Sequence, residues 1–138
     1  MTGFEMFWPI VGQALLVMLL YALLCYRRAR AVRQGLMSRN AMVLGKDEHE
    51  DSLKVRNAIA NQFEIPVLFY VCCVLLYITE ADNLPSVVAA WLFVATRYAH
   101  AAEHVMRNRV KLRAPLFMVG FALLAGMWAW LVLWMATS

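Results

Sequence analysis

Four long apolar stretches separated by more polar segments dominate the sequence. They cover about residues 7–26, 55–77, 85–106 and 115–136. Each stretch has the roughly 20 residues that a helix needs to cross the hydrocarbon core of a bilayer. Pro85 is also a good first-turn residue for the third helix. The pattern predicts an all-α membrane protein, a four-transmembrane-helix bundle that forms a single domain over residues 1–138.

The composition agrees with a membrane protein. Of the 138 residues, 63% are hydrophobic and 16% are charged, against roughly 45–50% and 25% in an average soluble domain. A soluble domain of this size would have to expose much of that apolar excess. The net charge of +4 could suggest a nucleic-acid ligand, but every Lys and Arg falls between Arg27 and Arg56 or between Arg97 and Arg113. We therefore expect no nucleic-acid partner.

The basic residues predict the topology, because positively charged loops stay on the cytoplasmic side. They concentrate in the loops at about residues 27–54 and 107–114, while the N-terminus, the 80–84 connection and the C-terminus carry none. Both termini are therefore expected outside. The compact chain and this strong bias favour a bacterial inner membrane. The mixed-charge segment 46–51 is expected to be a solvated turn before the second helix.

Several polar residues fall inside the predicted spans. At 100° per residue, Asn61 and Glu64 share a face of the second helix, and Arg97, His100 and His104 share a face of the third. An unpaired charge at the depth of Glu64 or Arg97 costs at least about 2.5–3.5 kcal/mol. We therefore expect these two to pair, within a protomer or across a subunit interface. The cluster indicates a site for an anionic polar ligand that enters from the cytoplasm, or else an ion pair that only fixes helix packing.

A metal site is a further alternative. The segment from His100 to His104 matches the H-x-x-E-H zinc pattern, with Glu103 in the acidic position. A catalytic zinc needs a third protein ligand, and Arg97 on the same face disfavours a dication. We therefore expect no bound metal, although a metal-dependent protein stays a hypothesis.

Two motifs carry a family resemblance. The run VRNAIANQFEIPVLF at residues 55–69, and RYAH at 97–100 followed by RAP at 113–115, resemble the second- and third-helix signatures of the MAPEG superfamily. These are membrane-associated proteins of eicosanoid and glutathione metabolism, which include microsomal glutathione transferases. The resemblance implies a homotrimer that binds glutathione between adjacent subunits near the cytoplasmic side.

The resemblance also implies roles for individual residues. The positions that match residues binding glutathione are Asn61, Glu64, Arg97, His100 and, at the end of the first helix, Arg28. Arg113 matches an Arg that activates the thiol in some members, since an adjacent cation stabilises the thiolate. His104 stands where the family transferases usually have a Tyr, one turn after the third-helix His. We take Arg113 and His104 as the candidate catalytic residues.

The function implied is that of a membrane enzyme with glutathione as its cosubstrate. It would conjugate or reduce lipophilic electrophiles or hydroperoxides, in the manner of a glutathione transferase or peroxidase. Its partners would be membrane lipid, glutathione, a lipophilic small molecule and further copies of the chain. Since some members bind lipid without catalysis, the alternative is a non-catalytic scaffold for a lipid or an acidic ligand.

Overall fold

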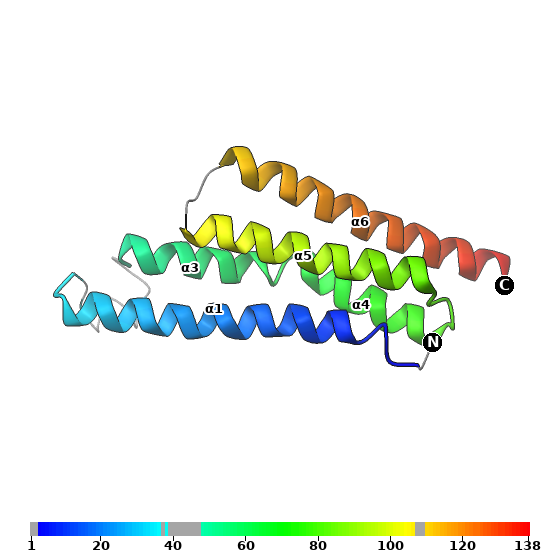
Figure 1. Cartoon of the computed structure of the whole chain (residues 1–138), viewed down its shortest axis with the longest axis horizontal. Helices are drawn as coiled ribbons and strands as arrows, with labels where there is room; N and C mark the ends of the chain where they lie inside the picture. Colours follow the sequence, from blue (N-terminus) through cyan, green and yellow to red (C-terminus); the bar gives the residue numbers. More distant parts are fainter. Residues whose placement is uncertain (1–2, 37, 39–47, 107–109) are drawn as a thin grey trace.

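The computed structural model describes residues 3–36, 38, 48–106 and 110–138, whose regular secondary structure is helical (Figure 1). The helices are α1 (Trp8–Arg33), α3 (Glu50–Asn61), α4 (Ile65–Ile78), α5 (Leu84–Met106) and α6 (Val110–Thr137). Helix α5 packs against α6, α1 and α3, while α4 packs mainly against α6. The N-terminal residues and the C-terminus lie at the same end of the bundle (Figure 1).

Three of the four predicted spans are long and apolar enough to cross a membrane. Among the described residues these segments are Trp8–Arg33, Glu50–Ile78, which joins α3 and α4, and Lys111–Thr137. Helix α5 has 23 residues at the predicted position, but Arg97, His100 and His104 lower its mean hydropathy. The four predicted stretches are thus helical, and the most polar one packs against three of the other helices.

The helices extend beyond the predicted spans. Helix α1 continues to Arg33 and α6 begins at Val110, so residues 27–33 and 110–114, which were assigned to loops, are helical. The apolar pattern marks only the part of a helix that lies in the hydrocarbon core. The same helix can continue into water, where its residues can be arginines, and the pattern does not detect that part. The predicted loops are therefore too long at these boundaries.

The second predicted helix is interrupted, which corrects the expected continuous span at 55–77. Helix α3 ends at Asn61 and α4 begins at Ile65. Pro66 has no N–H, and its ring clashes with the preceding turn of a helix. The backbone N–H groups of residues 62–64 donate to carbonyls three residues back. Glu64 therefore lies in the break, directly before α4.

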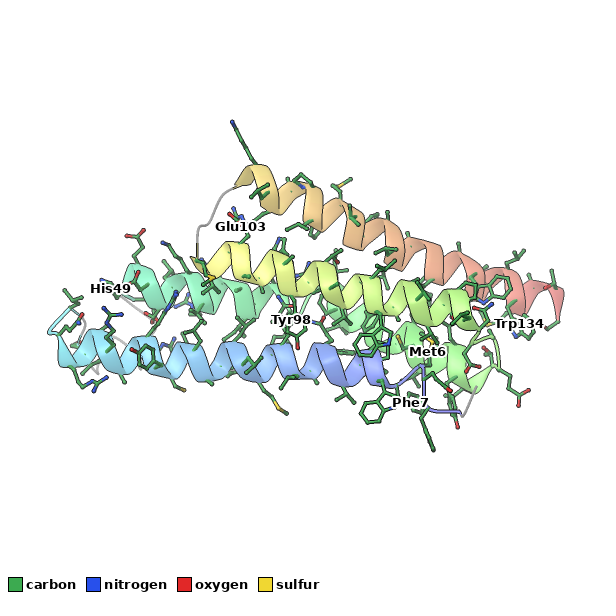
Figure 2. All side chains as sticks on the ribbon, viewed as in Figure 1. Met6, Phe7, His49, Tyr98, Glu103 and Trp134 are labelled. Atoms are coloured by element: carbon green, nitrogen blue, oxygen red, sulfur yellow. The ribbon has the colours of Figure 1, made fainter. Side chains whose placement is uncertain are left out.

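Two tryptophans of α6 fix the connection between α4 and α5. The indole nitrogens of Trp130 and Trp134 donate to the carbonyls of Ala81 and Thr79, each over 2.9 Å. The connection contains Glu80 at a left-handed φ of 57°. These bonds hold the turn on α6 at the end of the bundle that carries both termini (Figure 2).

The core consists of two apolar clusters with a polar layer between them. The cluster nearer the termini includes Phe69 and Phe93, whose rings stack with centroids 4.5 Å apart. The second cluster contains residues of α1, α3 and α5, including Leu20 and Ala101. Tyr98 packs against both clusters, midway along the bundle (Figure 2), and donates to the Gly12 carbonyl over 2.7 Å. Between the clusters along these helices lie Gln13, Asn61, Gln62, Arg97 and His100.

Candidate functional site

The polar layer joins α3 to α5 through Asn61 and His100. Asn61 is the last residue of α3, and His100 lies on the buried face of α5. The Asn61 Nδ2 lies 3.3 Å from the His100 Nδ1. Since a carboxamide nitrogen can only donate, Nδ1 of His100 accepts, and a neutral ring then carries its proton on Nε2. Two of the residues predicted to bind the ligand are therefore in contact.

Arg97 is buried in the same layer without a hydrogen-bond partner for two of its nitrogens. Its side chain is only 2% exposed, and within the described residues neither Nε nor Nη2 finds an acceptor. Buried donors of this kind cost free energy unless they are paired. An anionic group brought next to Arg97 would therefore be bound strongly.

Glu64 does not form the direct ion pair with Arg97 that was expected within a protomer. The two side chains interact electrostatically, but among the described residues no ion-pair contact joins them. Glu64 is exposed and sits in the helix break at φ −98° and ψ −102°. The break caused by Pro66 changes the rotation of the chain after Asn61 and turns Glu64 outward. The other predicted arrangement, a pair across a subunit interface, stays a prediction.

The two candidate catalytic residues lie close to each other on α5 and α6. Arg113 interacts electrostatically with His104 and with His100. The His104 Nδ1 and the Arg113 Nε are buried and have no partner in the described part of the chain. The rings of His100 and His104 meet edge to face at 6.1 Å, and Phe117 of α6 lies 6.4 Å from His100. The structure thus brings His100, His104 and Arg113 together.

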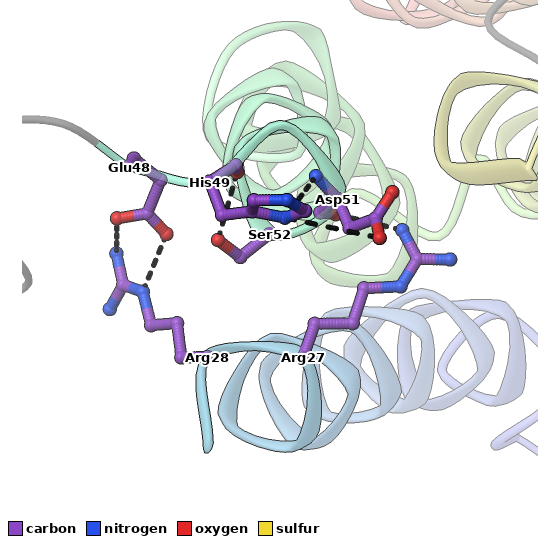
Figure 3. A network of polar contacts seen from close by, with 6 residues as sticks. All are labelled: Arg27, Arg28, Glu48, His49, Asp51 and Ser52. Carbon is purple, nitrogen blue, oxygen red and sulfur yellow. Dashed lines mark hydrogen bonds and ion pairs between the residues drawn. The ribbon is translucent and has the colours of Figure 1, made fainter. Parts of the chain in front are cut away.

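Arg28 lies apart from this cluster, at the basic end of the bundle. It forms an ion pair with Glu48 through two hydrogen bonds, of 2.8 Å from Nε and 3.3 Å from Nη2 (Figure 3). The Glu48 side chain is only 3% exposed, so the expected solvated turn is wrong at this residue. Burial alone would raise the pKa of Glu48, but hydrogen bonds from Arg28 and Ser52, with nearby Arg56, lower it overall.

Arg27 connects three helices at the same end. Its Nη1 donates to the Asp51 carbonyl over 2.8 Å and to the Val105 carbonyl over 3.3 Å. Val105 is in the last turn of α5, where backbone carbonyls lack partners within the helix. Figure 3 shows Arg27 and Arg28 reaching from α1 toward the start of α3. Both arginines therefore hold the basic end of the bundle together.

Gln13 and Gln62 form a buried contact that the sequence analysis missed. The Gln13 Nε2 donates to the Gln62 Oε1 over 2.8 Å, and the two side chains are 0% and 1% exposed. A glutamine in an apolar span is itself a signal, because polar side chains in a membrane hydrogen-bond across helices. The partner of Gln13 could not be predicted from the apolar pattern, because the helix break after Asn61 determines where the Gln62 side chain points.

An apolar groove of about 610 Å³ runs between α5 and α6. It is lined on α5 by Pro85 and Ala89, and on α6 by residues that include Val119, Gly126 and Trp130. On α6 the groove begins six residues beyond Arg113, which is about 9 Å along a helix. The polar cluster and a surface suited to an apolar ligand are therefore near each other.

The donors in the polar layer suit an anionic ligand better than a metal ion. No group of three or more His, Cys, Asp or Glu side chains among the described residues could hold a metal. The cluster instead offers the nitrogens of two guanidinium groups and two imidazoles, and guanidinium groups bind carboxylates well. Such nitrogens can bind an anionic group.

A comparison with protein families identifies the chain. The family model described as "MAPEG family" matches residues 6–133, nearly the whole length. The searches of curated proteins and of solved structures gave no match. The match confirms the family resemblance, and with the three apolar helices it assigns the protein to the membrane. The chain is an integral membrane protein that belongs to the MAPEG family.

Proposed function

We propose that this protein binds glutathione in the polar layer and uses its thiol to conjugate or reduce lipophilic electrophiles or hydroperoxides. The binding residues are Asn61, Glu64, Arg97 and His100, with Arg28 at the basic end of the bundle. Arg113 and His104 act on the thiol. The apolar groove between α5 and α6 provides an adjacent surface for the lipophilic reactant.

The buried nitrogens without partners carry this proposal. Arg97 contributes Nε and Nη2, Arg113 contributes Nε, and His104 contributes Nδ1. Glutathione has two carboxylates and a thiol, and guanidinium groups bind carboxylates in bidentate fashion. A ligand with these groups would pair with buried nitrogens that the described residues leave without a partner.

The proposed chemistry is thiolate activation. A free thiol has a pKa near 8.5, and an adjacent cation stabilises the anion. Arg113 supplies that charge, and His104 accepts the thiol proton on an unpaired nitrogen. The thiolate then forms a carbon–sulfur bond, either by adding to an electrophilic carbon or by displacing its leaving group. With a hydroperoxide it attacks the terminal oxygen and the O–O bond breaks. The released alkoxide takes the proton from His104 and leaves as an alcohol, and the resulting glutathione sulfenic acid is reduced by a second glutathione to the disulfide with loss of water.

We further propose that the protein is a homotrimer in which α5 also crosses the membrane and both termini face outward. The exposed position of Glu64 within the span Glu50–Ile78 supports an assembly. A carboxylate facing hydrocarbon is costly, and such residues normally face a protein partner or a polar cavity. A cation of a neighbouring subunit would pair with Glu64 and complete the site.

A non-catalytic scaffold that binds a lipid or an acidic ligand is the second candidate. The apolar groove of about 610 Å³ favours it, since that volume lies within the range of small-molecule sites. His104 in place of the family Tyr is consistent with a relative that has lost the transferase reaction.

One titration separates these candidates. Purified protein in detergent is titrated with glutathione, and binding heat is measured in parallel with the ultraviolet absorbance of the thiolate. Saturation of both signals supports the enzyme, and S-methylglutathione, which has no thiol, should then give heat without the absorbance. Heat without a thiolate signal from glutathione itself supports the scaffold. Absence of both signals contradicts the glutathione site.

A further inference from the structure

Gln13 and Gln62 are the first two members of a hydrogen-bond chain that crosses the bundle. The Gln13 Nε2 of α1 donates to the Gln62 Oε1 over 2.8 Å, and the Gln62 Nε2 donates to the Ala58 carbonyl over 3.1 Å. These bonds therefore run from the second turn of α1 to the last turn of α3. Both glutamine side chains are fully buried.

The Gln62 side chain replaces a backbone bond that the helix break removes. In a regular α-helix the N–H of Gln62 would donate to the carbonyl of Ala58. Here that N–H donates to the Ile59 carbonyl over 2.9 Å, so the Ala58 carbonyl takes its donor from the Gln62 side chain instead. A buried carbonyl without a donor costs free energy, so this side-chain hydrogen bond stabilises the helix break.

The last turn of α3 is thus held on two sides. Gln62 connects it to Gln13 of α1, and the preceding residue, Asn61, connects it to His100 of α5. Successive side chains on a helix differ in direction by about 100°, so the two contacts oppose rotation of this turn about its axis. Loss of either contact leaves one side-chain hydrogen bond to a neighbouring helix at this turn, beside the apolar packing of Ala58 and Ile59.

We propose that Gln13 is a positioning residue for the polar site. It orients Gln62 and, through the last turn of α3, keeps the Asn61 carboxamide against Nδ1 of His100. The Gln13 Oε1 has no hydrogen-bond partner among the described residues, so within them the Gln13 side chain hydrogen-bonds to Gln62 through Nε2. The proposal concerns the geometry of the site and does not depend on which anionic ligand occupies it.

The histidine signals provide the test. The chain has three histidines, so ¹⁵N-histidine protein in detergent micelles gives few signals, and H49Q and H104Q assign them. The N61A variant defines the His100 Nδ1 signal without its donor. We expect the Q13M variant to shift the His100 Nδ1 signal toward its position in N61A. Q62M should shift the signal at least as far. The double variant Q13M/Q62M should shift it no further than Q62M alone.

The control is L16M, a volume-conserving change on the same buried face of α1, which should leave the His100 signal in place. An unchanged His100 signal in Q13M, whether or not the melting temperature falls, would show that Gln13 only stabilises the bundle and would overturn the proposal. If Q13M does not fold, Q13N, whose side chain is one methylene shorter, and Q62M are measured instead. An unshifted His100 Nδ1 signal in both Q13N and Q62M would also overturn the proposal. No ligand is needed, so a failed glutathione titration leaves this result unaffected.

Discussion

The carboxamide of Asn61 donates to Nδ1 of His100 over 3.3 Å, which joins the end of α3 to the buried face of α5. Hydrogen bonds between membrane helices contribute about 0.6–1.7 kcal/mol. We expect N61A to lower the free energy of unfolding by that amount and to weaken glutathione binding by more than tenfold, because a ligand contact and the orientation of His100 are lost together.

The matched control for this variant is N57A, because Asn57 lies one turn earlier on α3 and is exposed. Its melting temperature and glutathione affinity should stay close to those of the wild type. Equal losses in N57A and N61A would mean that the Asn61 contact has no special role.

Arg113 should control the thiolate signal without affecting assembly. We expect R113A to lose the thiolate absorbance at saturating glutathione, while size-exclusion chromatography shows an unchanged complex. R113K should keep part of the signal, since lysine retains the charge without the planar guanidinium group. The control is K111A, which removes an exposed cation of the same helix. A full thiolate signal in R113A would remove Arg113 from the mechanism.

The ion pair between Arg28 and Glu48 should make stability depend on pH. The pKa of Glu48 is lower in the folded chain than its ordinary value, so the carboxylate stabilises the fold above the unfolded pKa. That stability is lost as the pH falls through the folded pKa. At pH 7.5 we expect E48Q to lower the free energy of unfolding by about 1–3 kcal/mol, and the difference from the wild type should shrink below about pH 4.

Glu50 provides the control for the ion pair. It is 81% exposed and lies 3.8 Å from Lys54, and exposed pairs of this kind contribute only about 0.3–0.5 kcal/mol. Thermal unfolding of E50Q should therefore differ little from the wild type at either pH. A loss in E50Q as large as in E48Q would show that the effect follows net charge rather than the buried contact.

The sequence predicted the parts of the fold that depend on local periodicity. The apolar stretches gave four helical regions because crossing a bilayer needs about 20 apolar residues. The 100° step of a helix placed Asn61 on the polar face of the second predicted helix, and the chain is helical up to that residue. His104 and Arg113 interact electrostatically, while their catalytic roles stay a prediction.

Other features depend on tertiary contacts that no local pattern contains. Pro66 was known from the sequence, but whether it bends a helix or ends it depends on packing, and here the break turns Glu64 outward. The burial of Glu48 depends on Arg28, twenty residues earlier, approaching from α1. The partner of Gln13 likewise depends on where Gln62 points after α3 ends.

Two glycines of α6 should respond in opposite directions to the same substitution. A Cβ at Gly120 would lie 2.9 Å from the Thr96 Oγ1, while a Cβ at Gly126 would meet no atom within 4 Å. Thr96 cannot easily move, because its hydroxyl donates to the Phe93 carbonyl over 2.6 Å. We expect G120A to lower the free energy of unfolding by about 1–3 kcal/mol through overpacking. G126A should raise it by about 0.5–1 kcal/mol, since alanine favours a helix over glycine. Both are measured by unfolding in mixed micelles, and stabilisation by G120A would contradict the close approach of α6 to α5 at this point.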